Sequence, residues 1–249
     1  VSYAPGPAHT VMDADRAVPP AKPVEASGRP GETRRGDAEA AFHTAPVKID
    51  AHYSHEREHH NAMEPHATIA AWDGDRLTLY DKSQWVDNVR TEIAHVFGMD
   101  EAKIHVVSPF VGGAFGSALR TWPHVTLAAM AAKHVGRPVR LELSRRQTYF
   151  SIGFRPRTEQ RVRLGATADG RLTSIIQEGI GQTSVYEQYA EVTLEPPRKI
   201  YSCPNVLTRY RLVPMHTNSP CPMRAPGTST GVMAHEIAMD ELAEALDMD

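Results

Sequence analysis

The residues whose types and spacing best suit catalysis or metal binding lie in the stretch HEREHHNAMEPH, residues 55 to 66. The segment from His55 to His59 satisfies H-E-x-x-H, a pattern that on a helix places two histidines on one face to bind zinc beside a catalytic glutamate. Two neighbouring features argue against that geometry. The alternating apolar pattern from Val47 to Tyr53 is typical of a half-buried strand, and Pro65 leaves barely two turns for a helix.

Histidine is abundant in this part of the chain. Five histidines lie between residues 52 and 66, so a chance match to a short pattern is easy. The sequence therefore favours a histidine cluster at the surface or at the end of a strand. A zinc hydrolase that would use His55, Glu56 and His59 is the alternative hypothesis.

A glycine-rich segment, SPFVGGAFGS at residues 108 to 117, lies between a predicted strand and a predicted helix. It is not a phosphate-binding P-loop, because no Lys-Ser or Lys-Thr follows. Backbone N–H groups at such a junction suit an anionic ligand, which Gly112, Gly113 and Gly116 would let approach closely beside the apolar ring of Phe115. An ordinary tight connection explains the same residues equally well.

Two further polar side chains belong to short loops. Arg224, in PMRAPGTSTG, precedes a Pro-Gly turn that opens the last predicted helix, and a guanidinium suits planar contact with a carbonyl, carboxylate or phosphate. Gln84, in DKSQW, can donate an amide hydrogen bond after the second strand of a predicted hairpin. Alone, neither residue defines a site, because a loop arginine is more often solvated or salt-bridged.

The composition sets limits on the class of protein. The chain has 249 residues, 41% hydrophobic and 23% charged, which is ordinary for a globular protein with a substantial core. A formal net charge of −3 argues against a nucleic-acid surface, and no run of apolar residues is long enough to span a bilayer. Cys203 and Cys221 lack the spacing of a cysteine-ligated zinc or iron–sulfur site.

The elements that must position these residues follow from periodicity and turn chemistry. Residues 1–46 are rich in Pro, Gly and charge, which predicts a connector from a preceding domain with little packed structure. The mixture of strands and helices, without regular βαβ alternation, predicts an α+β fold with mixed sheets and packed helices. The predicted elements are a strand at 47–53, a hairpin around 73–75, a helix at 85–98, a short buried strand at 103–109, a helix at 121–138, a strand at 139–144, a hairpin at 159–181 and a final helix with Thr228 or Ser229 as N-cap.

Three motifs in order give these residues a common context: HHNAMEPHATIAAWDGDRLTLYDKSQW, SPFVGGAFGS and CPMRAPG. Together they resemble the molybdenum-cofactor subunit of the xanthine dehydrogenase/aldehyde oxidoreductase family, and the bacterial aldehyde oxidoreductase branch is the most similar. The resemblance covers roughly residues 40 to 249. It implies that residues 47–249 form the N-terminal part of the molybdenum-cofactor-binding domain, and that Glu64 and His66 shape the start of a strand near the pocket.

The resemblance implies specific roles. Gln84 matches the glutamine whose amide faces the apical oxo ligand of molybdenum. Phe115 and Gly116 match the pair beside the metal and its dithiolene, with backbone N–H groups as donors, and Gly113 lies in the same loop. Arg224 matches the arginine of the cofactor and substrate pocket, the one catalytic role assigned, and Ala225 follows it in the backbone segment near the site. No protein side chain ligates the metal, because the pyranopterin holds it.

The implied activity is oxidation of aldehydes, or of aromatic heterocycles, with water as the oxygen source. The implied cofactor is a molybdenum-pyranopterin, either molybdopterin or its cytosine dinucleotide. Iron–sulfur clusters and FAD would be carried by partner subunits, and the remaining part of the molybdenum subunit would complete the site. The resemblance fits a cytoplasmic enzyme, or a periplasmic one exported through a partner's signal.

The chain also departs from the family pattern. The third glycine of G-G-G-F-G is Ala114 here, and the two charged purine anchors fall at Leu119 and Val192. Unpaired polar edges of a purine would be costly in such an apolar pocket, so aldehydes are the expected substrates. The family's general-base glutamate has no match in this chain, which therefore resembles a fragment or one of several polypeptides, expected to be inactive alone. A non-catalytic scaffold of the same fold is a further alternative.

Overall fold

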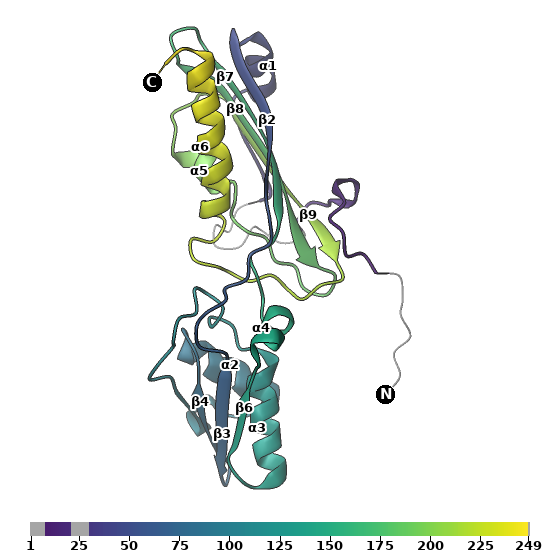
Figure 1. The fold of residues 1–249 in the computed structure, drawn as a ribbon, viewed down its shortest axis with the longest axis vertical. Coiled ribbons are helices and arrows are strands. Elements are labelled where there is room, and N and C mark those ends of the chain that lie inside the picture. The colour runs from purple at the N-terminus through teal and green to yellow at the C-terminus, as the bar shows by residue number, and fades with distance from the viewer. Residues whose placement is uncertain (1–7, 21–29, 249) are drawn as a thin grey trace. The chain divides into compact units, whose positions relative to one another are not determined.

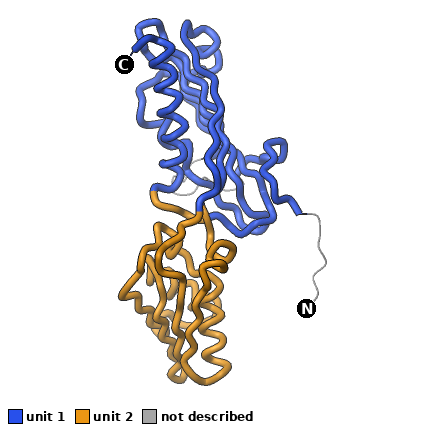
Figure 2. The backbone as a smooth tube through the Cα atoms, viewed as in Figure 1, with its two compact units in different colours: residues 1–58, 155–220, 225–249 blue, residues 59–154, 221–224 orange. Residues whose placement is uncertain are grey.

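The computed structural model describes residues 8–20 and 30–248, which divide into two compact units. Unit 1 comprises residues 1–58, 155–220 and 225–249, and unit 2 comprises residues 59–154 and 221–224 (Figure 2). Each unit is built around its own sheet (Figure 1). Within the described residues, no helix combines the length and apolarity needed to cross a membrane.

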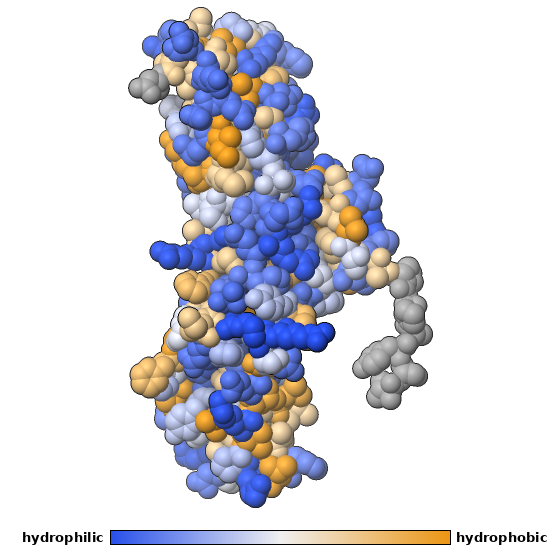
Figure 3. Space-filling model, in the orientation of Figure 1, coloured by the Kyte–Doolittle hydropathy of each residue, from blue (hydrophilic) through white to orange (hydrophobic). Residues whose placement is uncertain are grey.

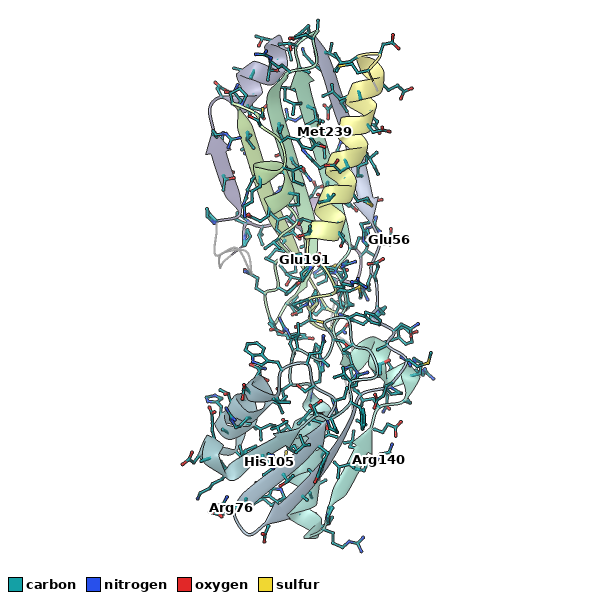
Figure 4. The ribbon with its side chains drawn as sticks, turned by 90° about the vertical axis from the view of Figure 1, so that its left-hand side faces the viewer. Glu56, Arg76, His105, Arg140, Glu191 and Met239 are labelled. Atoms are coloured by element: carbon teal, nitrogen blue, oxygen red, sulfur yellow. The ribbon has the colours of Figure 1, made fainter. Side chains whose placement is uncertain are left out.

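Unit 2 is a four-stranded sheet with both of its longer helices on one face. The strand order is β5-β4-β3-β6, with β4 and β5 parallel and the other pairs antiparallel. His105 on β5 and Arg140 on β6 mark the two edge strands in Figure 4. The elements are β3 (Ala67–Asp73), β4 (Arg76–Asp81), α2 (Val86–Phe97), the 3-10 turn η2 (Glu101–Lys103), β5 (Ile104–Val107), α3 (Pro123–Val135), β6 (Val139–Glu142) and α4 (Arg145–Ser151).

The core of unit 2 forms where small residues of α3 let the helix approach the sheet. Ala128 and Ala129 are completely buried and pack with Leu79 of β4 and Ile93 of α2. Both helices end as the sequence predicts, because Gly98 and Gly136 adopt the left-handed conformation as C-caps. The outer side of α3 is apolar in places, and orange side chains gather over it in Figure 3. Its exposed apolar residues are Leu127, Met130 and Val135.

Unit 1 is a five-stranded sheet with a helix on each face. The strand order is β1-β9-β8-β7-β2, and only β8 and β9 pair in parallel. Successive residues of β8 serve opposite faces: Ile175 packs under α6, whereas Ile176 packs under α1. Met239 of α6 packs against the same cluster as Ile175 (Figure 4). The elements are η1 (Ala14–Arg16), β1 (Glu32–Arg35), α1 (Ala38–Thr44), β2 (Val47–His55), β7 (Thr158–Ala166), β8 (Leu172–Ser184), α5 (Glu195–Lys199), β9 (Val206–Met215) and α6 (Thr228–Ala245).

The structure corrects the expectation for residues 1–46. Within its described part, β1 pairs with β9, and α1 buries Phe42 against β8 and β9. Asp37 caps α1 by accepting a hydrogen bond from the Ala40 N–H. Ala38 and Phe42 are thus part of the core of unit 1. The sequence did not reveal this helix because Pro, Gly and charged residues dominate the segment around it. Residues 1–7 and 21–29 of the predicted connector lie outside the described residues.

Two smaller expectations also change. The strand β5 is an edge strand in which only Ile104 is fully buried, rather than a buried strand. The N-cap of α6 is Gly227, not Thr228 or Ser229. A side chain at position 227 would lie 2.6 Å from the backbone of Val192, so this position accepts only glycine and the helix begins without a side-chain cap.

Candidate functional site

The candidate site forms at the carboxyl ends of the two parallel strands of unit 2. Because β4 and β5 are parallel neighbours, the segments that follow them emerge at the same edge of the sheet. Ser83 after β4 and Ser108 after β5 join these segments. The Ser108 hydroxyl accepts a hydrogen bond from the Ser83 N–H at 3.1 Å and donates one to the Ser83 carbonyl at 3.0 Å. This reciprocal pair fixes the segment that carries Gln84 beside the start of the glycine loop.

Gln84 is held at both its backbone and its side chain. Its N–H donates to the Ala118 carbonyl at 2.9 Å, and its side-chain Oε1 accepts from the Gly116 N–H at 3.0 Å. A backbone N–H can only donate, so this contact assigns the amide oxygen to Gly116. The amide nitrogen of Gln84 carries two donor hydrogens, and the residue is exposed. The Gly116 N–H is therefore engaged by Gln84 in this structure.

The glycine loop adopts a conformation that few sequences tolerate. Positive φ angles occur at Gly112 (59°), Gly113 (80°), Phe115 (58°) and Gly116 (107°), but not at Ala114. A missing third glycine therefore costs no backbone strain. Phe115 does carry strain, since the left-handed region costs a residue with a Cβ about 1–2 kcal/mol. Its ring is 46% exposed, and strained residues of this kind cluster at ligand sites.

The NAMEPH segment closes over the loop from the other side. The Glu64 N–H donates to the Gly112 carbonyl at 3.2 Å, and the Glu64 side chain occupies the space where a Gly112 side chain would lie. The Lys82 amino group donates to the Glu64 carbonyl, which ties this segment to the end of β4. Glu64 thus supports the loop from outside the fold's core.

Arg224 reaches the same loop through its backbone. The Arg224 N–H donates to the Phe115 carbonyl at 2.8 Å, and its side chain is exposed. A Cβ on Gly116 would lie 2.3 Å from the Pro222 carbonyl oxygen, so the loop and the 221–224 segment touch backbone to backbone. Four of the sequence-predicted site residues, Gln84, Phe115, Gly116 and Arg224, are brought together in unit 2.

The other predicted residues lie nearby in the chain or in unit 1. Leu119 is half-buried, and its N–H donates to the Gly116 carbonyl at 3.2 Å within the same turn. Ala225 directly follows Arg224, belongs to unit 1 and has a positive φ of 56°. Val192 also belongs to unit 1, where it packs beside Leu194 and Tyr210.

The zinc hypothesis is not supported by the geometry. His55 is the last residue of β2, and the residues that follow it form a loop rather than a helix. The His59 ring packs on Tyr149 and Phe154, at centroid distances of 5.0 and 5.8 Å. Among the described residues, no group of three His, Cys, Asp or Glu side chains is arranged to hold a metal ion. The H-E-x-x-H match therefore lacks the helix that zinc binding requires.

Comparison with known proteins gives the site a context. The family model for the molybdopterin cofactor-binding domain matches residues 21–249. The chain belongs to this family. The cofactor-binding domain has curated relatives in several molybdenum enzymes, and none of them supports a zinc hydrolase.

Two relatives and one solved structure show the extent of the similarity. The aldehyde oxidoreductase molybdenum-binding subunit PaoC of Escherichia coli (strain K12) is 38% identical over 86% of this chain, which spans 29% of that protein. The nicotinate dehydrogenase large molybdopterin subunit of Eubacterium barkeri is 29% identical over 86% of the chain and 51% of that protein. The aldehyde oxidoreductase of Desulfovibrio gigas is 27% identical with a TM-score of 0.80, over 88% of this chain and 25% of that structure. The cofactor-binding domain thus spans about a quarter to a half of these proteins.

A buried polar group that no motif indicates lies at the end of β4, close in the chain to Gln84. Asp81, at the end of β4, accepts a hydrogen bond from the Thr68 hydroxyl, and burial raises the pKa of its carboxyl to about 6. Burial also lowers the pKa of His124 to about 4 and that of His66 to about 3. The His124 Nε2 lies 4.0 Å from the Asp81 Oδ1. No pattern in the sequence marks Asp81 or His124, since their burial depends on how α3 packs on the sheet.

A second buried acid lies in unit 1. Glu191 (labelled in Figure 4) is 1% exposed, and burial raises the pKa of its carboxyl to about 7. Its nearest cation is Arg155, whose Nε lies 3.7 Å away and whose other nitrogen pairs with Glu58 at 2.6 Å. Glu191 directly precedes Val192, one of the predicted substrate-pocket residues.

Proposed function

We propose that this cofactor-binding domain forms part of a molybdenum-dependent oxidoreductase that acts on aldehydes. The observation that carries the proposal is the fixed orientation of Gln84, whose amide oxygen is held by the Gly116 N–H. The hydrogen bond to the oxygen therefore sets the direction in which the NH₂ group of the Gln84 side chain can donate to a ligand. The 38% identity to an aldehyde oxidoreductase subunit favours an aldehyde over the purine substrate of other family members.

The donors present fit a pyranopterin-held metal. The Gln84 NH₂ group is a donor in a preorganised position, and it would hold an acceptor oxygen of the bound cofactor. Gln84, Phe115, Gly116 and Arg224 together form what we call the cradle. Arg224 is exposed, and a guanidinium suits phosphate or carbonyl oxygens. When bound, the molybdenum cofactor supplies a site that accepts two electrons from the aldehyde, with water as the oxygen source.

The chain's own residues bind and orient. Gln84 donates to an oxygen of the cofactor, and Phe115 provides a rigid apolar wall against which a flat substrate can rest. Arg224 would hold the carbonyl oxygen of the substrate or an oxygen of the cofactor, and Gly113 lets the backbone of the loop approach the site closely. Leu119, half-buried in the turn that follows Gly116, adds apolar surface beside these residues, which favours an aldehyde.

The partners are part of the same proposal. The remaining part of the molybdenum subunit contributes the general-base glutamate, and iron–sulfur and FAD subunits carry electrons away. The domain itself contacts a small aldehyde substrate and no nucleic acid. The enzyme is cytoplasmic, or periplasmic if a partner supplies the export signal.

The test is made on the complete complex purified from its native host. We expect about one molybdenum per complex and aldehyde oxidation that falls by roughly tenfold or more in Arg224→Ala, because one charge-assisted contact is lost. The matched control is Arg146→Ala, an exposed arginine of α4 in the same unit, which should leave turnover unchanged. A complex without molybdenum, or full activity in Arg224→Ala, would show that the proposal is wrong.

A further inference from the structure

His60 contacts the 221–224 segment at the place where that segment meets the glycine loop. It lies in the loop between β2 and β3, within unit 2, and is half-buried. Its Nε2 is 2.9 Å from the carbonyl oxygen of Pro222, 162 residues further along the chain. A carbonyl oxygen can only accept, so the contact requires the proton on Nε2 and thereby sets the tautomer of His60.

Pro222 depends on this contact for its orientation. Proline has no N–H group, so its carbonyl is its one hydrogen-bonding group on the backbone. That same carbonyl oxygen is pressed against the Cα of Gly116, where a Cβ would come within 2.3 Å of it. Any rotation of the Pro222 peptide would therefore change both the contact with Gly116 and the path of the chain toward Arg224.

Gly116 and Arg224, which both lie near the Pro222 carbonyl, each make a backbone hydrogen bond within the cradle. The Gly116 N–H orients the Gln84 amide, and the Arg224 N–H is bound to the Phe115 carbonyl. The Pro222 carbonyl oxygen lies close to Gly116, and Pro222 precedes Arg224 by two residues in the chain. A single imidazole thus holds the point on which the relative placement of Gln84 and Arg224 depends.

A nucleophilic role for this histidine does not fit the surroundings. The Cys221 Sγ lies 3.8 Å from the His60 Nε2, but Cys221 is completely buried, and its N–H is bound to the Phe154 carbonyl. A substrate could not reach that sulfur without disrupting the fold. The shorter contact of Nε2 is the one to Pro222, and it uses the single proton that the tautomer supplies.

We propose that His60 is a positioning residue that locks the Pro222 carbonyl against Gly116, so that Gln84 and Arg224 are presented together to the cofactor. The inference deepens the proposed function and rests on it for the identity of the ligand. The hydrogen-bond lock itself is a property of the fold and can be tested without the cofactor's chemistry.

The test compares His60→Gln with His60→Leu in the complete complex. The glutamine amide nitrogen extends about as far as Nε2 and restores an N–H donor, whereas leucine fills space without one. The first readout is hydrogen exchange at the amides of Gly116 and Arg224, followed by mass spectrometry. We expect exchange to be roughly threefold to tenfold faster in His60→Leu, the effect of losing one hydrogen bond, and close to the parent rate in His60→Gln.

The second readout is molybdenum content per complex, with kcat and KM for an aldehyde. His60→Leu should lose molybdenum and turnover together, and His60→Gln should recover both. His95→Leu, an exposed histidine near the end of α2, is the matched control and should behave like the parent. Unchanged exchange in His60→Leu, or equal acceleration in His60→Gln, would overturn the proposal. Absence of molybdenum from the parent complex would instead refute the proposed function, while the exchange result still decides the lock.

Discussion

The side-chain oxygen of Gln84 accepts a hydrogen bond from the backbone N–H of Gly116 at 3.0 Å, 32 residues further along the chain. This contact turns a flexible amide into a donor with a fixed direction. A preorganised donor is worth more at a reacting centre than one that must reorient, because no reorganisation is needed when charge develops. The structural role of the amide oxygen and the proposed role of the amide NH₂ group can be separated by a substitution that keeps the oxygen and removes the NH₂ group.

Gln84→Glu keeps the acceptor and removes the donor. A carboxylate oxygen still accepts from the Gly116 N–H, so we expect little change in the thermal unfolding midpoint. Aldehyde turnover should fall by roughly tenfold to a hundredfold, because a negative charge replaces the NH₂ group that we propose donates to the cofactor. Steady-state kinetics and calorimetry of the complete complex check both expectations. A Gln84→Glu variant with full turnover would mean that the donor end of the amide has no role.

Gly116→Ala tests the backbone contact under the cradle. The added Cβ would lie 2.3 Å from the Pro222 oxygen, at a φ of 107° that residues with a side chain rarely adopt. We expect the free energy of unfolding to fall by about 2–4 kcal/mol, from strain and from displacement of Pro222. Denaturant-induced unfolding measures the loss.

The matched control for that variant is Gly136→Ala. Gly136 also has a positive φ, 63°, but nothing lies within 4 Å of its ideal Cβ. It should cost only the conformational term, about 1 kcal/mol. Equal losses in the two variants would show that the contact with Pro222 contributes nothing.

Acid should destabilise unit 2 through its buried histidines. The folded state holds the pKa of His66 near 3 and that of His124 near 4, whereas both titrate near 6.5 when exposed. Between pH 6.5 and about 4 the unfolded chain therefore binds more protons, and stability falls as the pH falls. The slope is at most about 1.4 kcal/mol per pH unit for each histidine. Unfolding midpoints across this range should depend less on pH in His66→Gln and in His124→Gln.

Asp81 acts in the opposite direction in the same pH range. Its folded pKa is about 6 against an ordinary 3.8, so its carboxyl destabilises the fold as pH rises from about 4 to 6 and is neutral in effect below that range. Asp81→Asn should raise stability at pH 7 and steepen the acid-induced loss, because the two histidines then act unopposed. A variant that is less stable than the parent at pH 7 would contradict the assignment.

Chelation should leave the protein unaffected. His55 is the last residue of β2, and the ring of His59 packs on aromatic rings. The two histidines therefore do not share the face of a helix, which zinc binding by this motif requires. Dialysis against a zinc chelator should change neither the unfolding midpoint nor aldehyde turnover. His55→Ala should likewise keep the metal content of the complex. A loss of folding or activity on chelation would restore the zinc hypothesis.

Local signals in the sequence were sufficient for much of unit 2. The hairpin around Gly74 and the two helices that end at Gly98 and Gly136 are confirmed, because turn chemistry and glycine C-caps act within a few residues. The α+β class is confirmed as well, because the spacing of apolar residues along the sequence differs between strands and helices. Long-range pairing left no such trace. The parallel β8–β9 pair and the packing of α1 depend on contacts between distant segments.

The candidate site shows the same division. Residue type and motif order predict four of the site residues, Gln84, Phe115, Gly116 and Arg224. The hydrogen bonds among them could not be inferred from one sequence. His60 and Asp81 were not predicted to act, because a histidine that binds a carbonyl and a carboxyl raised by burial are recognised only from their surroundings. Their roles stay predictions until the variants above are measured.

The four residues 221–224 complete unit 2 although the rest of that unit ends at residue 154. Most of unit 1 is therefore synthesised before residues 221–224 are available to pack against the glycine loop. Bringing His60 and Pro222 together means closing a loop of 162 residues, whose entropy cost rises only slowly with length but must be met before the contact forms. The hydrogen bond between His60 and Pro222 therefore cannot form until the chain has been synthesised past residue 222, which places the completion of unit 2 after the synthesis of the β-strands of unit 1.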